Sequence, residues 1–223
     1  MFQTEKKMPN SDEISDKERL IAHFSTVAIF GAMGAFAVPR VSILTTEFNW
    51  ILILKFGLLF GLICSVGNIL LYYFYFVKSI SKKDYLAVEN HYHSIGILSR
   101  VFYGGFVEEI MFRWGIMSLL LWLLQFISEP VNTISVFIAL GITSILFALV
   151  HIPSIKMVSP EPKPAMYIYT NVGNIWVGIF TGWAFLKAGI FAAIIVHILF
   201  HLLWYPIQRR GISKNSSKKE KLG

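Results

Sequence analysis

Residues 56–77 read FGLLFGLICSVGNILLYYFYFV, and no residue in this run carries a charge at neutral pH. An α-helix needs roughly 20 consecutive apolar residues to cross the hydrocarbon core of a bilayer. This run is therefore long enough for one membrane-spanning helix. Five further uncharged runs, most of them close to this length, are Ala22–Val38, Gly115–Ser128, Thr133–Val150, Ala165–Leu186 and Ala188–Ile207. The pattern predicts an all-α fold, a polytopic transmembrane helical bundle.

The bulk composition supports the same fold class. Hydrophobic residues make up 55% of the 223 residues, charged residues make up 15%, and the mean hydropathy is +0.61. A soluble domain has about 25% charged residues, so this chain has too few charges to cover a globular surface in water. We expect one helical domain, residues 20–207, between an N-terminal segment, 1–19, and a basic tail, 208–223. The predicted spans are 20–38, 50–77, 96–127, 133–151, 165–186 and 189–207.

The distribution of lysine and arginine predicts how the spans are oriented. If both termini are cytoplasmic, the inner segments hold four basic residues before the first span, three after the second, two after the fourth and six in the tail. The outer loops then hold only Arg40 and Lys187. Because basic residues concentrate on the cytoplasmic side of membrane proteins, we expect both termini inside. The net charge of +7 thus indicates anchoring to anionic membrane lipid and not a nucleic-acid partner.

The third predicted span carries charges that are costly inside a membrane. Glu108 and Glu109 are adjacent, and Arg113 follows in the same span. On a helix Glu109 and Arg113 lie at i and i+4 and can form an ion pair, whereas Glu108 points roughly 100° away. A structural ion pair would explain Glu109 and Arg113, but it leaves Glu108 as a candidate general base. Arg100, Gly104 and Gly105 interrupt the span, so we expect a broken or interfacial first half.

Histidines contribute polar groups from two further spans. His151 ends the fourth span on one stripe with Ser144 and Phe147, although a single histidine at a span end is more often interfacial. His197 and His201 lie at i and i+4 in the sixth span, a spacing at which two imidazoles can bind a metal. No glutamate follows His197 directly, unlike the motif of soluble zinc proteases. All these groups are predicted to lie in the inner half of the membrane, in a site that opens to the cytoplasm.

The sequence EEIMFR at 108–113, FALVH at 147–151 and His197 resemble the CAAX-protease and bacteriocin-processing (CPBP, or Abi) intramembrane proteases. This family includes the type 2 CAAX prenyl endopeptidases, and the motifs span residues 96–205. The resemblance implies that Glu108 activates water, that His151 helps to hold it and that Glu109 and Arg113 support the site. It also implies that His197 and the residue four positions later stabilise an oxyanion. Asn, or sometimes Asp, is usual at that later position, where this chain has His201.

The resemblance implies an endopeptidase that cleaves a peptide or a membrane-proximal protein at the cytoplasmic side of a bacterial or archaeal cell membrane. Two mechanisms stay open: a metalloprotease with a divalent ion such as zinc on Glu108, His151 and His197, or a metal-free glutamate mechanism. The alternative function is a non-catalytic membrane scaffold, or a bacteriocin immunity or regulatory protein. A small transporter or proton relay would use the same residues, but the sequence has no internal repeat. Substrate prenylation and oligomeric state stay open.

Weaker polar signals have less specific interpretations. His91 and His93 are expected at the membrane interface, and the Lys55 ammonium is expected to reach back to the membrane surface. Asn171 and Asn174 in the fifth span line a cavity or satisfy helix contacts.

Overall fold

The computed structural model describes residues 15–128, 131–159 and 161–220, and every regular element in these ranges is helical. The outermost parts of the predicted N-terminal segment and tail, and Pro160 in the inner loop, lie outside them. The helical elements are α2 (Asp16–Ala37), η2 (Val38–Arg40), α3 (Trp50–Leu71), η3 (Tyr72–Phe76), α4 (Val77–Ser79), α5 (Lys82–Ser94), α6 (Ile97–Ser99), η4 (Arg100–Glu108), η5 (Ile110–Met117), α7 (Ser118–Leu124), α8 (Thr133–Leu149), α9 (Ile152–Val158), α10 (Pro164–Ala188) and α11 (Ile190–Glu220).

Each predicted span coincides with a helical segment, and within the described residues four helices are both long and apolar enough to cross a membrane. They are Asp16–Arg40, Trp50–Ser79, Thr133–Val158 and Ile190–Gln208. The third predicted span contains four charged residues, and α10 contains polar side chains along its length. These two segments pack within the bundle, where neighbouring helices can satisfy polar groups. Six crossings and cytoplasmic termini therefore stay predictions, while α11 continues beyond its predicted span as one helix to Glu220.

The first half of the third segment is a continuous helix, so the predicted break is absent, while the predicted interfacial position stays a prediction. From Arg100 to Glu108 and from Ile110 to Met117 the backbone forms a π-helix, whose turns are wider than those of an α-helix. Just beyond the second of these stretches, Ser118 Oγ donates a hydrogen bond of 3.1 Å to the carbonyl of Arg113, five residues earlier. Wide helical turns in membrane helices often mark functional sites. Here they surround the Glu108–Glu109 pair.

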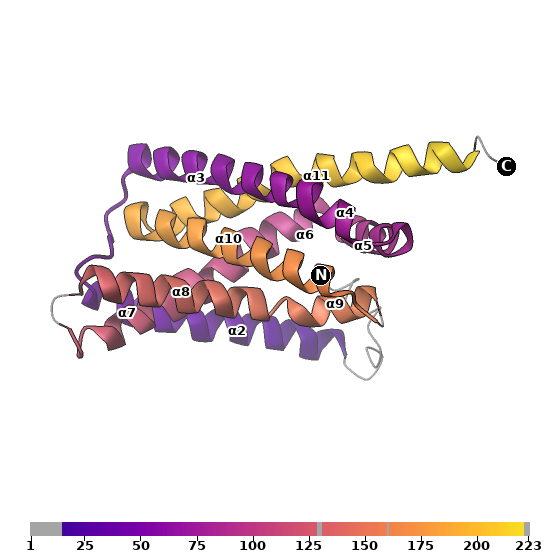
Figure 1. The fold of residues 1–223 in the computed structure, drawn as a ribbon. Helices are drawn as coiled ribbons and strands as arrows, with labels where there is room; N and C mark the ends of the chain where they lie inside the picture. Colours follow the sequence, from indigo (N-terminus) through magenta and orange to yellow (C-terminus); the bar gives the residue numbers. More distant parts are fainter. Residues whose placement is uncertain (1–14, 129–130, 160, 221–223) are drawn as a thin grey trace.

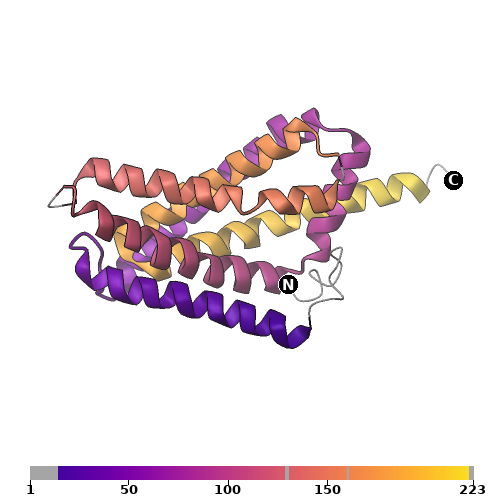
Figure 2. The same cartoon turned by 90° about the horizontal axis from the view of Figure 1, so that it is seen from below.

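Glycines allow the central helices to approach closely. α11 packs mainly against α3, η4 and α10, and α10 also packs against α8 (Figure 1). A Cβ on Gly57 of α3 would lie 2.7 Å from Ile195 on α11, and one on Gly178 of α10 would lie 2.9 Å from Ser144 on α8. Two motifs of glycines four residues apart, Gly57-x-x-x-Gly61 and Gly178-x-x-x-Gly182, thus occupy helix–helix contacts. α2 lies along the edge of the bundle against η5 (Figure 2).

The turn between α10 and α11 depends on Gly189. Its φ is +78°, in a region that residues with a Cβ rarely adopt. The tight turn sends the chain back along α10, and α10 packs against α11. This arrangement places the histidines of α11 within the bundle.

The segment between the second and third predicted spans, residues 78–95, contains a helix, α5. Ser81 caps it by accepting a hydrogen bond from Asp84 N, and α5 packs on α11 and α9. Val88 of α5 joins a buried cluster with aromatic residues of the neighbouring helices. α5 and α9 lie at the end of the bundle where α2 begins and α11 leaves it (Figure 1). That end is the one predicted to face the cytoplasm.

Candidate active site

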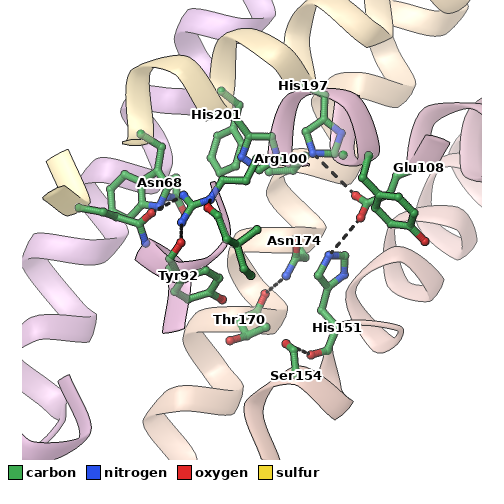
Figure 3. Close-up of a pocket in the computed structure, with 18 of the residues that line it drawn as sticks. Asn68, Tyr92, Arg100, Glu108, His151, Ser154, Thr170, Asn174, His197 and His201 are labelled. Atoms are coloured by element: carbon green, nitrogen blue, oxygen red, sulfur yellow. Dashed lines mark hydrogen bonds and ion pairs between the residues drawn. The ribbon is translucent and has the colours of Figure 1, made fainter. Parts of the chain in front are cut away.

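Three helical segments bring the predicted polar residues to one cavity of about 330 Å³. Glu108 comes from the end of η4, His151 from the residue before α9, and His197 and His201 from α11. All four line the cavity, and Figure 3 shows Glu108 facing both His151 and His197. The predicted convergence of these three segments is therefore present in the fold.

Glu109 and Arg113 lie behind the cavity and do not line it. Both residues are 0% exposed, and Arg113 Nε lies 3.3 Å from Glu109 Oε2, as the i, i+4 spacing predicts. The other carboxylate oxygen, Oε1, lies 2.6 Å from His197 Nδ1. Because a carboxylate paired with arginine accepts hydrogen bonds, we assign the proton to His197 Nδ1. This pair fixes the ring of His197 and directs its Nε2 toward the cavity.

Arg113 is held by more than its ion pair. The 3.3 Å contact with Glu109 is close enough for an ion pair, yet none of the guanidinium nitrogens makes an aligned hydrogen bond within the described part of the chain. The guanidinium carbon also lies 4.7 Å from the centre of the Phe147 ring. A cation over an aromatic face is attracted by the ring quadrupole. Phe147 thus links Arg113 on η5 to the end of α8, from which the chain leads on to His151.

Glu108 has no ion-pair partner on its own helix, as predicted, but it faces imidazoles from two others. Its Oε1 lies 4.0 Å from His151 Nε2, and its Oε2 lies 3.9 Å from His197 Nε2. These separations exceed a direct hydrogen bond. A polar contact of this length suits a bridging water molecule or substrate atom. The carboxylate is only partly buried, with 16% of its side chain exposed, so the cavity can supply that water.

His151 is oriented by the backbone of α8, the helix that precedes it. Its Nδ1 lies 2.7 Å from the carbonyl oxygen of Phe147. We assign a proton to Nδ1, because only a protonated nitrogen can donate to a carbonyl. In the neutral ring Nε2 then carries a lone pair and faces Glu108. Ser144, on the same predicted stripe, donates to the Leu140 carbonyl and does not line the cavity.

His201 packs against His197 in a space that Gly104 leaves open. The two imidazole rings are stacked, with centroids 4.9 Å apart. His201 Nδ1 is buried and has no hydrogen-bond partner among the described residues. A Cβ on Gly104 would lie 2.7 Å from His201 Nε2 and 3.3 Å from His197 Nε2. The sequence suggested only that Gly104 interrupts a helix. In the structure both histidine rings pack against Gly104, in the space that a side chain there would fill.

The residues that line the cavity also test the weaker predictions, which concern two asparagines and two histidines. Asn174 lines the cavity, although its amide donates to the Thr170 carbonyl, and Asn171 is not among the lining residues. His91 lines the cavity, while the side chain of His93 lies outside the described atoms. Sequence reasoning missed Arg100 as a cavity residue. Its charge within a predicted span was a signal that could have identified it.

The metal-bound alternative gains no support from the side-chain geometry. Across residues 15–128, 131–159 and 161–220, no group of three or more His, Cys, Asp or Glu side chains is arranged to hold a metal ion. Glu108, His151 and His197, the predicted ligands, form no such group. Metal dependence stays a prediction, and the chemistry below is derived from the side chains alone.

Comparison with known protein families shows to which family the chain belongs. Residues 91–203 match the family described as type II CAAX prenyl endopeptidase Rce1-like, and this range is just over half of the 223 residues. The chain belongs to the Rce1-like family. All six predicted site residues of this Rce1-like protein fall within the matched range, and no curated protein or solved structure matches it. Because Rce1-like proteins are proteases, family membership places the chain among the hydrolases, and its apolar helices make it an integral membrane protein.

Replacing Gly104 in this Rce1-like protein should displace the two histidines. In Gly104→Ala the new methyl group would overlap His201 Nε2, so the stacked rings must shift away from η4. A misplacement of about 1 Å in a catalytic site can cost about 10²-fold in rate. We expect a loss of peptide hydrolysis of that order, measured with purified protein in detergent.

Gly141→Ala is the matched control for this substitution. Nothing lies within 4 Å of a Cβ placed on Gly141 in α8. The control should retain the parent rate. Equal rates for Gly104→Ala and Gly141→Ala would show that the histidines tolerate displacement and are not positioned by Gly104.

Proposed function

We propose that this Rce1-like protein is an intramembrane endopeptidase that hydrolyses a peptide bond at the cytoplasmic side of the membrane. The observation that carries the proposal is the position of Glu108, whose two carboxylate oxygens face His151 and His197 across 4.0 and 3.9 Å in one cavity. A carboxylate and imidazoles at such spacing suit general acid–base catalysis on a water molecule. The substrate is a peptide or a membrane-proximal protein.

Glu108 and His151 act together on the attacking water. Both Glu108 Oε1 and the unprotonated Nε2 of His151 are hydrogen-bond acceptors, so a water between them donates one hydrogen to each. Its oxygen lone pairs then remain free to attack the scissile carbonyl carbon. Glu108 takes a proton as the new C–O bond forms. It returns that proton to the leaving amine when the C–N bond breaks, which balances the hydrolysis.

The two histidines of α11 are suited to the negative charge that develops on the carbonyl oxygen. His197 donates its Nδ1 proton to Glu109, so its Nε2 can donate to the oxyanion only when both ring nitrogens carry a proton. His201 has neither ring nitrogen committed to a hydrogen bond within the described residues. It can therefore donate to the oxyanion as a neutral ring. On this basis His201 replaces the usual asparagine.

The proposal is tested by incubating purified protein in liposomes with a library of membrane-proximal peptides and identifying products by mass spectrometry. Parallel reactions with a metal chelator test the metal-free mechanism. We expect cleavage that survives the chelator. Loss of cleavage on chelation would overturn the metal-free mechanism. If the protein cleaves nothing while its cellular role survives Glu108→Gln, the non-catalytic scaffold replaces the enzyme as the better account.

His201→Asn should keep the rate of hydrolysis at or above that of the parent. Asparagine restores the usual amide donor at this position and is smaller than the ring that packs against Gly104. His201→Ala removes the donor altogether and should lower kcat by about 10²–10³-fold. Both variants are compared in the same cleavage assay. Equal losses in the two variants would show that the ring itself, and not hydrogen-bond donation, is required.

A further inference from the structure

Arg100 lies in the same cavity as Glu108, but at its other side. It lines the cavity and is only 7% exposed. Figure 3 shows the Arg100 side chain extending toward Tyr92 and away from Glu108, which faces His151. The proposed hydrolysis does not use Arg100. Burying a cation in a membrane protein costs free energy, so a buried arginine is a candidate functional residue.

Uncharged groups hold the guanidinium in place. Nη1 donates to Gln208 Oε1 at 2.6 Å, Nε donates to the Ile95 carbonyl at 3.2 Å, and Nη2 donates to the Tyr92 carbonyl. The guanidinium carbon also lies within 6 Å of two rings, at 5.6 Å from Tyr92 and 5.4 Å from Tyr205. These contacts fix the position of the cation but do not neutralise it. No carboxylate within the described ranges lies in ion-pair distance of Arg100.

Glu89 on α5 is the carboxyl whose charge acts on Arg100 from a greater distance. It is 0% exposed and accepts a hydrogen bond of 2.8 Å from the Tyr72 hydroxyl. Burial raises the pKa of Glu89 to about 7, although the Tyr72 hydrogen bond and the charge of Arg100 both act to lower it. Burial thus favours the uncharged form of this carboxyl. It compensates the charge of Arg100 only in part.

The free donors of Arg100 suit a carboxylate. A guanidinium has five N–H groups. The three hydrogen bonds above use one on each nitrogen, which leaves one N–H on Nη1 and one on Nη2 without a partner among the atoms that the structure describes. Arginine binds carboxylates with two such groups at once, and charge-assisted bonds of this kind are among the strongest in proteins.

We propose that Arg100 binds a carboxylate of the peptide substrate and thereby sets where the chain is cut, an inference that rests on the proposed endopeptidase function. The carboxylate comes from the C-terminus of the peptide or from an acidic side chain. Arg100 and Glu108 are eight residues apart on one helix, and an α-helix would span roughly 12 Å over that length. Because the turns of η4 are wider, its rise per residue is smaller and about 12 Å is an upper bound. An extended peptide covers that distance with at most about three or four residues. Cleavage therefore falls within a few residues of the bound carboxylate.

Three forms of one peptide test the proposal: a free C-terminus, an amidated C-terminus, and an amidated peptide with aspartate as its last residue. A charge-assisted hydrogen bond contributes about 1.5–3 kcal/mol, so kcat/KM should be about 10- to 100-fold higher with a carboxylate than with the plain amide. If the aspartate peptide has the kcat/KM of the plain amide, Arg100 binds only the terminal carboxylate. If it has the kcat/KM of the free acid, Arg100 binds a carboxylate from either source.

Arg100→Gln should remove this preference, with the loss confined to the carboxylate peptides. The ratio of rates between peptides is informative even if the variant is less stable. Arg40→Gln is the matched control, because Arg40 is an exposed arginine outside the cavity, and it should keep the preference. A parent enzyme that cleaves acid and amide equally, or an Arg100→Gln variant that keeps the preference, overturns the proposal.

Binding measurements separate this proposal from the proposed hydrolysis. Fluorescence anisotropy of the three labelled peptides is measured with Glu108→Gln protein and with Glu108→Gln, Arg100→Gln protein. Tighter binding of the carboxylate peptides only when Arg100 is present supports the anion site, even if no peptide is cleaved. Equal binding of all three peptides to both proteins rejects it, even if cleavage occurs.

Discussion

Glu108→Gln should lower the rate of peptide hydrolysis by about 10²–10⁴-fold, the usual cost of losing a general base. Glutamine keeps the size and polarity of the side chain but cannot accept a proton from water. The fold should be unaffected, because Glu108 contacts the two imidazoles only at 3.9–4.0 Å and is partly exposed. Single-turnover cleavage and the thermal unfolding midpoint in detergent measure the two effects separately.

Glu161→Gln makes the same carboxylate-to-amide change at an exposed position outside the cavity. It should cleave at the parent rate. The proposed mechanism is wrong if Glu108→Gln also cleaves at that rate. A large fall in the unfolding midpoint of Glu108→Gln would instead assign Glu108 a structural role.

Arg113→Ala should lower the free energy of unfolding by about 3–5 kcal/mol, because it leaves a buried Glu109 carboxylate without its cation. Both residues are 0% exposed, and the substitution also removes the contact between the guanidinium and Phe147. Hydrolysis should fall as well, since Glu109 orients His197. Chemical unfolding in detergent gives the stability change. Unchanged stability would mean that the charge of Arg113 is not paired with Glu109.

A double-mutant cycle separates the ion pair from packing. Arg113→Met fills much of the same volume without charge, and Glu109→Gln keeps an oxygen that can accept from His197 Nδ1. Each single variant leaves one buried charge unpaired, whereas the double variant leaves none. The double variant should therefore be more stable than the sum of the single losses predicts. Additive losses would show that the two charges do not interact.

Local spacing alone predicted several features of this protein. Uncharged runs of span length predicted the helical segments, because an apolar helix is the form in which a chain satisfies its backbone in lipid. The Glu109–Arg113 pair followed from the i, i+4 geometry of one helix. Both glycine motifs lie at helix contacts. The order of the motifs also indicated the family that residues 91–203 match.

Contacts between helices decided the rest, because they depend on how segments far apart in the sequence dock. The bond from His197 to Glu109 joins α11 to the third segment across 88 positions, and no spacing rule on either helix indicates it. The same holds for the hydrogen bond from Arg100 to Gln208, 108 positions apart, and for the histidines that rest on Gly104. The sequence marked Arg100 and Gly104 as interruptions of a helix. Only the packed bundle gave each a place in the cavity.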